Sequence, residues 1–427
     1  MFRNALECAN YMNQKKLIIT SVIVYFVAAL AAYLGTTTLA STGNSRMDQA
    51  QNVVQPTVPS EPLTEQCPIN GAMYGETARQ LWETRRPLAV VIENHQESRP
   101  QSGISSADVV YEAVSEGGVT RTLSIFYCQD AKVVGPVRSA RVHFINLLRE
   151  WGNYPLYAHV GGANCDVTTG SGCANGAPAD ALGLVRKIGW NFYNDLNQFS
   201  IPYPFFYRDY DRLPGVATEH TMYTSTAKLW EYAAKNRELT NVDEEGVSWD
   251  EDWTPWTFAD EAPQAKRGKE TPIVYSFYDT NVSQYGVRWE YDASTNTYKR
   301  FNGGKPHTDF NTDAQLIAKN VIVIEAVESP ANDDYPGGHI VYRLTGTGPM
   351  YAFQNGNVIT GTWSKETLDS KMLFLDENGN EISMVGGTVW ISMLPLGNGV
   401  QYGKEAQATP KKTQTTDEDT ADDVTPE

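Results

Sequence analysis

The first apolar run of the chain is long, uncharged and separate from everything after it. Residues 17–34 read LIITSVIVYFVAALAAYL, with Lys15 and Lys16 directly before them and no further cation until Arg46. A helix rises about 1.5 Å per residue, so this run, extended to residue 36, can cross the roughly 30 Å hydrocarbon core of a bilayer. Because the cations stand on one side only, we expect residues 1–16 to remain in the cytoplasm.

A cleaved signal peptide is the alternative interpretation of this run, with Thr-Leu-Ala-Ser behind it as a cleavage site of small residues. The run is long for a signal peptide, so we expect a transmembrane anchor at residues 17–36. No cysteine follows it closely enough for lipid attachment, since Cys8 precedes it. Residues 37–66 are polar, contain proline and lack periodicity, which predicts a disordered stalk.

Strand-like and helix-like patterns alternate in residues 67–237. Runs rich in β-branched residues predict strands at residues 88–93, 109–114, 122–127 and 133–137. Apolar residues at helical spacing, among them Val142, Ile145 and Leu148, predict a helix over residues 140–151. A second helix is expected over residues 225–236. This mixture predicts an α/β layered domain.

From residue 271 to residue 400 the pattern changes to short strands separated by turns. The strand-like runs are IVYSFY, VRWEYD, TYKRF, NVIVIEA, HIVYRL, MYAFQNGNVITGTW and TVWISMLPL. The Asn-Gly dipeptides at residues 355–356 and 378–379 favour tight hairpins. We therefore predict a mainly antiparallel β domain here, and for the whole chain an α+β fold class with one N-terminal transmembrane helix.

Two acidic segments lie outside these predicted domains. Residues 238–270 lack a clear period and predict a linker, in which Trp253 and Trp256 pack against a domain; exposed contacts for a sugar or a partner are the alternative. Residues 401–427 are poor in apolar side chains and predict a disordered tail. The formal net charge of −17 argues against a nucleic-acid partner, because binding phosphates requires a surplus of Lys and Arg on one face.

Cysteine usage fits an exported body. Four cysteines follow the predicted anchor, an even number for an oxidising compartment. Cys165 and Cys173 bracket a short loop and are the favoured pair, which leaves Cys67 with Cys128, although four cysteines allow three connectivities. A zinc site is the alternative. The chain has no CxxC motif and no clustered histidines, so we expect no metal and no cofactor.

Glu112 and Glu116 are the candidate acid–base residues. The period of two in the strand at residues 109–114 places Glu112 among apolar neighbours, where a carboxylate needs a partner. A glycine turn after Glu116 is expected to bring Arg121 toward Glu112. A structural ion pair that closes the hairpin is one interpretation. A carboxylate with a perturbed pKa in a cleft is the other.

Arg138, Ser139 and Arg141 form the candidate anion site. They stand between a predicted strand and a predicted helix, with the two arginines three residues apart on one helical side. Free N–H groups at a helix start and two guanidinium groups suit a phosphate or a carboxylate. In the alternative interpretation both arginines pair with Glu112, Glu116 or Glu150 inside the protein. The segment lacks the GxxxxGK[ST] pattern of a phosphate-binding loop.

Three further side chains are candidates because they follow predicted strands. His159 precedes a glycine pair and is expected to be either a satisfied core histidine or an assistant in catalysis. His95 and Arg99 come after the strand at residues 88–93. If neighbouring strands are parallel, their C-terminal ends bring His95 and Arg138 to one crevice. The other histidines show no ligand spacing.

Several stretches occur in an order that is specific to one family. They are RRPLAVVIENHQESRPQSGISSADVVYEAVSEGGVTRTLSIFY, GPVRSARVHFINLLREW, YAHVGG, EHTMYTS, and NGNVITGTWSK with GGTVWISML. Over roughly residues 85–396 they resemble the YerB-like lipoprotein family. The resemblance implies an envelope location and two domains of unknown function, and it carries no catalytic residues. Family members are often anchored through a lipidated Cys, whereas here a transmembrane segment is expected to hold the chain.

Three hypotheses follow for the function. The first is a membrane-anchored extracytoplasmic protein that binds an anionic envelope component, such as a wall polymer, through Arg121 and the candidate anion site. The second is an extracytoplasmic hydrolase or transferase acting on a phosphorylated or glycosidic envelope substrate, with one of the two glutamates as acid–base and His159 assisting. The third is a structural module that docks other envelope proteins. We favour binding or docking over catalysis.

Overall fold

The structure, a computed structural model, describes residues 61–407 of the chain. The predicted cytoplasmic segment, the predicted anchor at residues 17–36 and most of the predicted stalk and tail lie outside this range. Within the range, no helix has both the length and the apolar character needed to cross a bilayer.

One mixed sheet of eleven strands contains strands from both halves of the sequence. The N-terminal half supplies β3 (Leu88–Glu93), β4 (Val109–Glu116), β5 (Val119–Phe126), β6 (Leu156–His159) and β7 (Asp195–Asn197). The C-terminal half supplies β16 (Asn320–Pro330), β17 (Ile340–Arg343), β18 (Gly346–Gln354), β19 (Asn357–Lys365), β20 (Leu373–Asp376) and β22 (Val389–Pro395). The order is β20-β19-β18-β16-β22-β4-β5-β3-β6-β7, and β17 pairs with β16.

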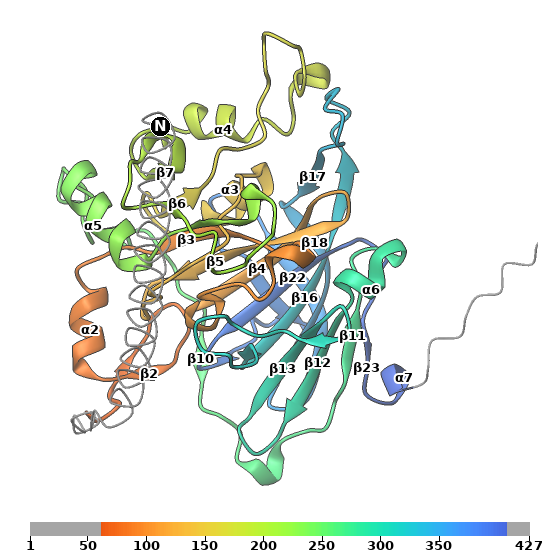
Figure 1. Ribbon diagram of the computed structural model, residues 1–427. Coiled ribbons are helices and arrows are strands. Elements are labelled where there is room, and N and C mark those ends of the chain that lie inside the picture. The colour runs from red at the N-terminus through yellow and green to blue at the C-terminus, as the bar shows by residue number, and fades with distance from the viewer. Residues whose placement is uncertain (1–60, 408–427) are drawn as a thin grey trace, which may run out of the picture. The chain divides into compact units, whose positions relative to one another are not determined.

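The two halves meet where β22 pairs in parallel with β4. The register runs from Val389 opposite Val109 to Ser392 opposite Glu112. Figure 1 shows the blue β22 beside the orange β4. The segments predicted as separate domains, residues 67–237 and 271–400, therefore share one hydrogen-bonded sheet.

A second sheet is antiparallel throughout and comes from the C-terminal half alone. Its strands are β11 (Ile273–Tyr275), β12 (Val287–Asp292), β13 (Thr297–Asn302), β14 (Lys305–Pro306), β15 (Ile317–Ala318) and β23 (Gln401–Tyr402). Elsewhere in this half, the predicted Asn-Gly hairpin joins β18 to β19, and both Asn355 and Gly356 have positive φ as such a turn requires. The prediction of mainly antiparallel strands is confirmed, with the parallel pair β16 and β22 as an exception.

Helices and small strand pairs complete the fold. The helices are α2 (Glu76–Trp82), α3 (Val142–Leu148), α4 (Ala181–Lys187), α5 (Thr226–Arg237), α6 (Val282–Tyr285) and α7 (Gly403–Gln407). The pairs are β1 (Glu65–Gln66) with β2 (Met73–Tyr74), β8 (Tyr207–Arg208) with β9 (Met222–Tyr223), and β10 (Phe258–Ala259) with β21 (Met384–Val385). The described body is thus a mixture of helix and strand in which strand prevails.

Each face of the eleven-stranded sheet carries its own core. Along β4, Tyr111 and Ala113 face the core that contains α3 and α4, whereas Val110 and Val114 face the core that contains α5 and the second sheet. The alternation of side chains along a strand sends neighbouring residues to opposite faces. A strand buried on both faces therefore holds few polar residues, and each polar residue in it needs a partner.

Three segments differ from the expectation or refine it. Residues 133–137 form isolated bridges and no strand, because Pro136 has no N–H to donate to a ladder. The acidic linker packs against the body, and the Trp256 indole donates to the carbonyl of Met372 at 2.9 Å. Part of the predicted tail is ordered, since β23 pairs with β11 and α7 follows it.

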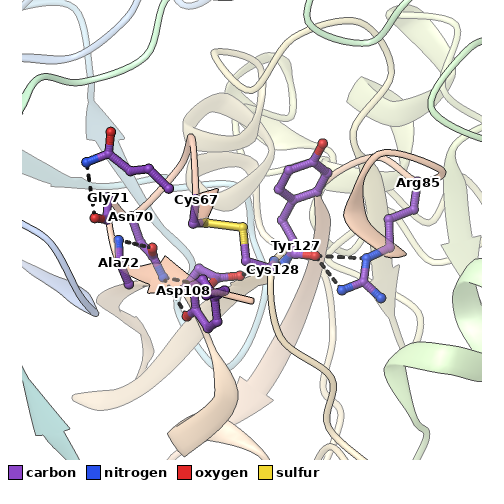
Figure 2. The surroundings of a disulfide bond; sticks show 10 residues. Cys67, Asn70, Gly71, Ala72, Arg85, Asp108, Tyr127 and Cys128 are labelled. Atoms are coloured by element: carbon purple, nitrogen blue, oxygen red, sulfur yellow. Dashed lines mark hydrogen bonds between the residues drawn. A yellow bond between two sulfur atoms is a disulfide. The ribbon is translucent and has the colours of Figure 1, made fainter. Parts of the chain in front are cut away.

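Two disulfides join Cys67 to Cys128 and Cys165 to Cys173, which confirms the favoured pairing. Figure 2 shows the first bond beside Asp108. The Asp108 carboxylate accepts hydrogen bonds from the amides of Tyr127 at 2.7 Å and Cys128 at 2.9 Å. Asn70 also donates to it, at 2.7 Å. The carboxylate thus joins the start of the body to the end of β5.

The longer disulfide loop predicts the larger contribution to stability. Cys67 and Cys128 are 61 residues apart, and Cys165 and Cys173 are eight apart. On the loop-closure model, we expect C67A/C128A to lose about 4 kcal/mol of unfolding free energy and C165A/C173A about 2.6 kcal/mol. Denaturant unfolding of the full chain in detergent measures both losses. Equal losses in the two double variants would contradict the loop-closure explanation.

The raised pKa of Asp108 predicts that the unfolding free energy decreases as the pH rises. Burial raises the pKa of Asp108 to about 6, against the opposing amides of Cys128 and Tyr127. The folded state therefore holds this proton up to a higher pH than the unfolded state, whose carboxyl titrates near pH 4. The contribution is complete below about pH 4 and is lost as the pH rises through 6. Comparing the unfolding free energy of the native chain and D108N from pH 4 to 7 measures it; parallel curves would refute the assignment.

Candidate functional site

Glu112 lies at the centre of the molecule with no exposed surface. The guanidinium of Arg300, on β13, donates to both carboxylate oxygens of Glu112, at 2.9 and 2.7 Å. The hydroxyl of Thr120 donates at 3.0 Å and the indole of Trp390 at 3.2 Å. A carboxylate with this many donors and no route to solvent is a structural group, so the geometry favours the ion-pair interpretation over acid–base catalysis.

Arg300 connects this carboxylate to further buried polar groups. Its guanidinium lies over the rings of Trp289 and Trp390, at 5.1 and 4.3 Å from their centroids. Its Nε donates to Nδ1 of His307 at 3.0 Å. Burial, with the nearby Arg300 and Arg99 cations, holds the pKa of His307 well below its usual value, so this ring is neutral and can accept that bond. The network spans both halves of the sequence.

The expected contact between Arg121 and Glu112 is wrong. Arg121 lies on the opposite face of the sheet, opposite Ala113, and donates to Glu116 at 3.1 Å and to the carbonyl of Ser139 at 3.0 Å. A β-bulge between Val114 and Glu116 reverses the alternation and turns Glu116 to this face. The alternation of residue types in the sequence does not indicate this bulge. The predicted register was therefore wrong at the end of the hairpin, where Arg121 was expected to face Glu112.

Arg141 shares Glu116 with Arg121, which makes an internal cluster of one carboxylate and two guanidinium groups. Burial is the main reason that the pKa of Arg121 falls to about 9, and the adjacent Arg141 cation lowers it further. Arg141 is buried. These two arginines are therefore committed to the protein itself, which matches the alternative interpretation.

Arg138 and Arg141 do not lie on one helical face, because α3 begins only at Val142. The amide of Arg138 is bound to the carbonyl of Val91, and the amide of Ala140 to that of Gly161. The expected free N–H groups are thus already used at these two positions. Arg138 differs from Arg141 in one respect: its side chain is 25% exposed.

Arg138 lies at the end of β3, where the parallel arrangement of β3 and β6 was expected to gather polar groups. Its Nε is 2.9 Å from one carboxylate oxygen of Glu93. The other oxygen of Glu93 is 2.7 Å from Nδ1 of His220. His95 stacks on His220 with 4.9 Å between the ring centroids. The predicted gathering of His95 and Arg138 is present, and Glu93 and His220 complete it.

His159 is a core histidine. Its Nδ1 lies 2.6 Å from the carbonyl of Gly161 and its Nε2 lies 2.6 Å from Asp195, and the ring has no exposed surface. Both ring nitrogens are therefore engaged by acceptors of the protein itself. A role as catalytic assistant finds no support in this enclosed position.

Arg99 serves a different part of the molecule. It donates to Asn94 at 3.0 Å and to the carbonyl of Gln284 at 2.8 Å, and so joins the end of β3 to the C-terminal half. Burial lowers the pKa of Arg99 to about 10. With Asn302 it lines a polar cavity of about 330 Å³, separate from the cleft at Arg138.

A cleft of about 580 Å³ opens beside Arg138 and holds the accessible polar groups. Its polar lining consists of Arg138, Ser139, Asn164, Asn197, Arg208 and Glu219. Arg208 is exposed and makes no ion pair within residues 61–407, although its Nη1 donates to the carbonyl of Thr218 and to the hydroxyl of Thr221, the latter at 3.2 Å. Of the sequence candidates, only Arg138 and Ser139 line this cleft.

Sequence reasoning missed Arg208, His220 and Arg300. Arg300 had a usable signal, because Tyr298, Arg300 and Asn302 alternate as the inward positions of β13. A buried inward arginine requires a buried carboxylate as partner. Arg208 and His220 had no comparable signal, since both lie beside short irregular segments.

One buried cluster contains side chains of types that bind metals, but two of them are joined in a disulfide. Cys67, Asp108 and Cys128 bring two sulfurs and a carboxylate together. Both sulfurs are joined to each other, as Figure 2 shows, so neither is a thiolate that could bind a metal ion. The oxidised cluster is a structural joint.

Comparison with known proteins identifies the same two parts. The family described as "Protein of unknown function (DUF3048) N-terminal domain" matches residues 74–240, and its C-terminal domain matches residues 276–391. YerB of Bacillus subtilis (strain 168), which is named as a lipoprotein, is 30% identical over 330 residues, covering 77% of this chain and 86% of that protein.

A crystal structure of YerB from Bacillus subtilis has the same fold. The TM-score is 0.61 at 24% sequence identity, and the match covers 80% of this chain and all of the solved one. The arrangement of the sheets and helices described above is therefore shared with an experimentally determined structure.

Because Glu112 and Arg300 form an ion pair, we expect the losses of unfolding free energy on replacing them to be strongly non-additive. R300M leaves Glu112 buried without its countercharge, which costs about 3–5 kcal/mol. E112Q/R300M removes both charges and keeps an acceptor for Thr120, so we expect it to lose less than R300M alone. Denaturant unfolding of the full chain in detergent measures the cycle, with K299M, at the neighbouring outward position, as control. A loss in the double variant equal to the sum of the single losses would exclude the pairing.

Proposed function

The chain belongs to the YerB-like family with the two DUF3048 domains, and on this premise we propose that it is a membrane-anchored envelope protein that binds an anionic group in the Arg138 cleft. The body lies outside the cytoplasm. The ligand is a phosphate-bearing or carboxylate-bearing envelope polymer. The observation that carries the proposal is Arg208, an exposed guanidinium in a cleft next to a second, partly exposed arginine.

Two disulfides support a location outside the cytoplasm, since disulfides persist in oxidising compartments. The relative named as a lipoprotein supports attachment to a membrane. In this chain we assign the attachment to residues 17–36, with the N-terminus in the cytoplasm, because no cysteine follows that apolar run closely.

The cleft combines charge with an apolar surface. The ring of Phe199 lines the cleft and is 77% exposed. An exposed aromatic ring beside guanidinium groups suits a sugar that carries a charged substituent. Glu219 also lines the cleft and is kept ionised, because a hydrogen bond from its own amide and the charge of Arg138 lower its pKa. This negative charge repels an anionic group, so the group is expected to bind next to Arg208 and away from Glu219.

Replacing Arg208 tests the proposal without disturbing the core. We expect R208A to weaken binding of labelled inorganic polyphosphate to the full chain in detergent by about tenfold, the effect of one lost charge-assisted hydrogen bond. Fluorescence anisotropy measures the affinity at two salt concentrations. R79A removes a half-buried arginine of α2 that pairs with Glu65, Glu76 and Glu83; it serves as the control and is expected to change affinity less than twofold.

Neutral dextran should not compete with polyphosphate, and polyglutamate competition distinguishes carboxylate from phosphate recognition. Absence of polyphosphate binding to the native chain, or equal weakening by R208A and R79A, would disprove the anion site. The salt dependence of the affinity should be smaller in R208A, since one cationic contact is lost.

A further inference from the structure

Two histidines and a glutamate meet close to Glu93, the partner of Arg138, although they come from distant parts of the chain. His95 and Glu97 belong to the turn after β3, and His220 ends a short 3-10 helix before β9. One ring nitrogen from each histidine and a carboxylate oxygen of Glu97 all lie within 4.8 Å of one another. Spacing along the sequence could not reveal this group, because 125 residues separate the two histidines.

Glu93 fixes the orientation of His220. Its carboxylate accepts from Nδ1 of His220 at 2.7 Å, which directs the lone pair of Nε2 toward Glu97. The second oxygen of Glu93 is held by Arg138 at 2.9 Å. Histidines that bind metals commonly have such a carboxylate behind them, which sets the tautomer and raises the basicity of the ligand nitrogen. Glu93 is buried, so this support is rigid.

The distance between His220 and Glu97 fits a pair of metal ligands better than a hydrogen bond. Nε2 of His220 and the nearest oxygen of Glu97 are 3.5 Å apart. A hydrogen bond from nitrogen to oxygen is about 2.7–3.2 Å long, so this contact is too long for a good one. Two ligands at about 2.05 Å from a tetrahedral zinc ion are about 3.3 Å apart, which is close to the observed separation.

His95 can complete the group by turning its ring. The rings of His95 and His220 are stacked with 6° between their planes, so their lone pairs lie in separate, nearly parallel planes and do not yet converge on one point. The ring of His95 is held by one long bond, 3.3 Å from the amide of Glu97. His95 is partly exposed and Glu97 is exposed, so both side chains have room to adjust around His220.

We propose that His95, Glu97 and His220 bind a Zn²⁺ ion. Two imidazoles and one carboxylate are a donor set that zinc accepts in tetrahedral coordination. Because two of the three ligands lie at the surface, the fourth position faces solvent and holds a water molecule. The site is separate from the anion contact at Arg208, and it needs no envelope polymer to be occupied.

The competing arrangement is a doubly protonated His220 held between Glu93 and Glu97. In that case the proton on Nε2 occupies the direction that zinc would take, and the cluster is a surface ion pair. The two arrangements differ in stoichiometric zinc uptake and in the cost of removing His95, since the ion pair does not need that ring.

Calorimetric titration with zinc chloride decides between them. The full chain is purified in detergent without a polyhistidine tag, stripped with a chelator and titrated. We expect one Zn²⁺ per chain, with affinity reduced at least tenfold in H95A and in E97Q. E83Q removes a comparably exposed glutamate directly after α2 and should bind zinc as the native chain does.

Cobalt gives a second measurement that reports on geometry. Co²⁺ in a tetrahedral site with these ligands absorbs strongly in the visible range, and this absorption should be absent in H95A. Unfolding temperatures in chelator establish that the variants are folded. No zinc uptake by the native chain, or an unchanged affinity in either H95A or E97Q, overturns the proposal.

Discussion

The ion pair between Glu112 and Arg300 is the interaction on which the rest of the structure depends. Both side chains are fully buried, and they come from the N-terminal and C-terminal halves of the sequence. A charge in such a place is tolerated only with a partner of opposite charge and hydrogen bonds from the groups around it. The pair therefore fixes the packing of the second sheet on the eleven-stranded sheet in one register, since a shift of either strand would leave a charge uncompensated.

Most of the charged side chains that were candidates for an active site likewise form ion pairs inside the protein. Glu116 neutralises Arg121 and Arg141, and Asp195 accompanies His159. Polar side chains that a ligand can reach lie at the end of β3. There one carboxylate oxygen of Glu93 contacts Arg138 and the other contacts His220. Ligand-accessible polar groups at the carboxyl ends of parallel strands fit the general location of sites in sheets with parallel strands.

Much of the fold could be predicted from local pattern. The expected strand at residues 88–93 coincides with β3, and the expected second helix matches α5, which begins after Ser225 as its N-cap. Cysteine spacing led to the disulfide pairing that the structure contains. These features depend on residues close in sequence, where periodicity and capping are visible.

The features that could not be predicted depend on long-range placement. The pairing of β22 with β4, the partner of Glu112 and the meeting of His95 with His220 all join distant segments. The bulge before Glu116 is local, yet it inverts which face a side chain takes without leaving a hydrophobic signal. The meeting of His95 and Arg138 near the end of β3 was therefore predictable from strand order, whereas the partners of Glu112 and Arg121 were not.

The insertion of β22 beside β4 has a consequence for biogenesis. Synthesis delivers the N-terminal strands first, and β4 then has an open edge until β22 emerges. An open, apolar edge invites pairing with other chains. Closing it requires a contact across nearly the whole body, which makes folding slow. The newly made protein therefore passes through an interval in which this edge can pair with another chain before β22 covers it.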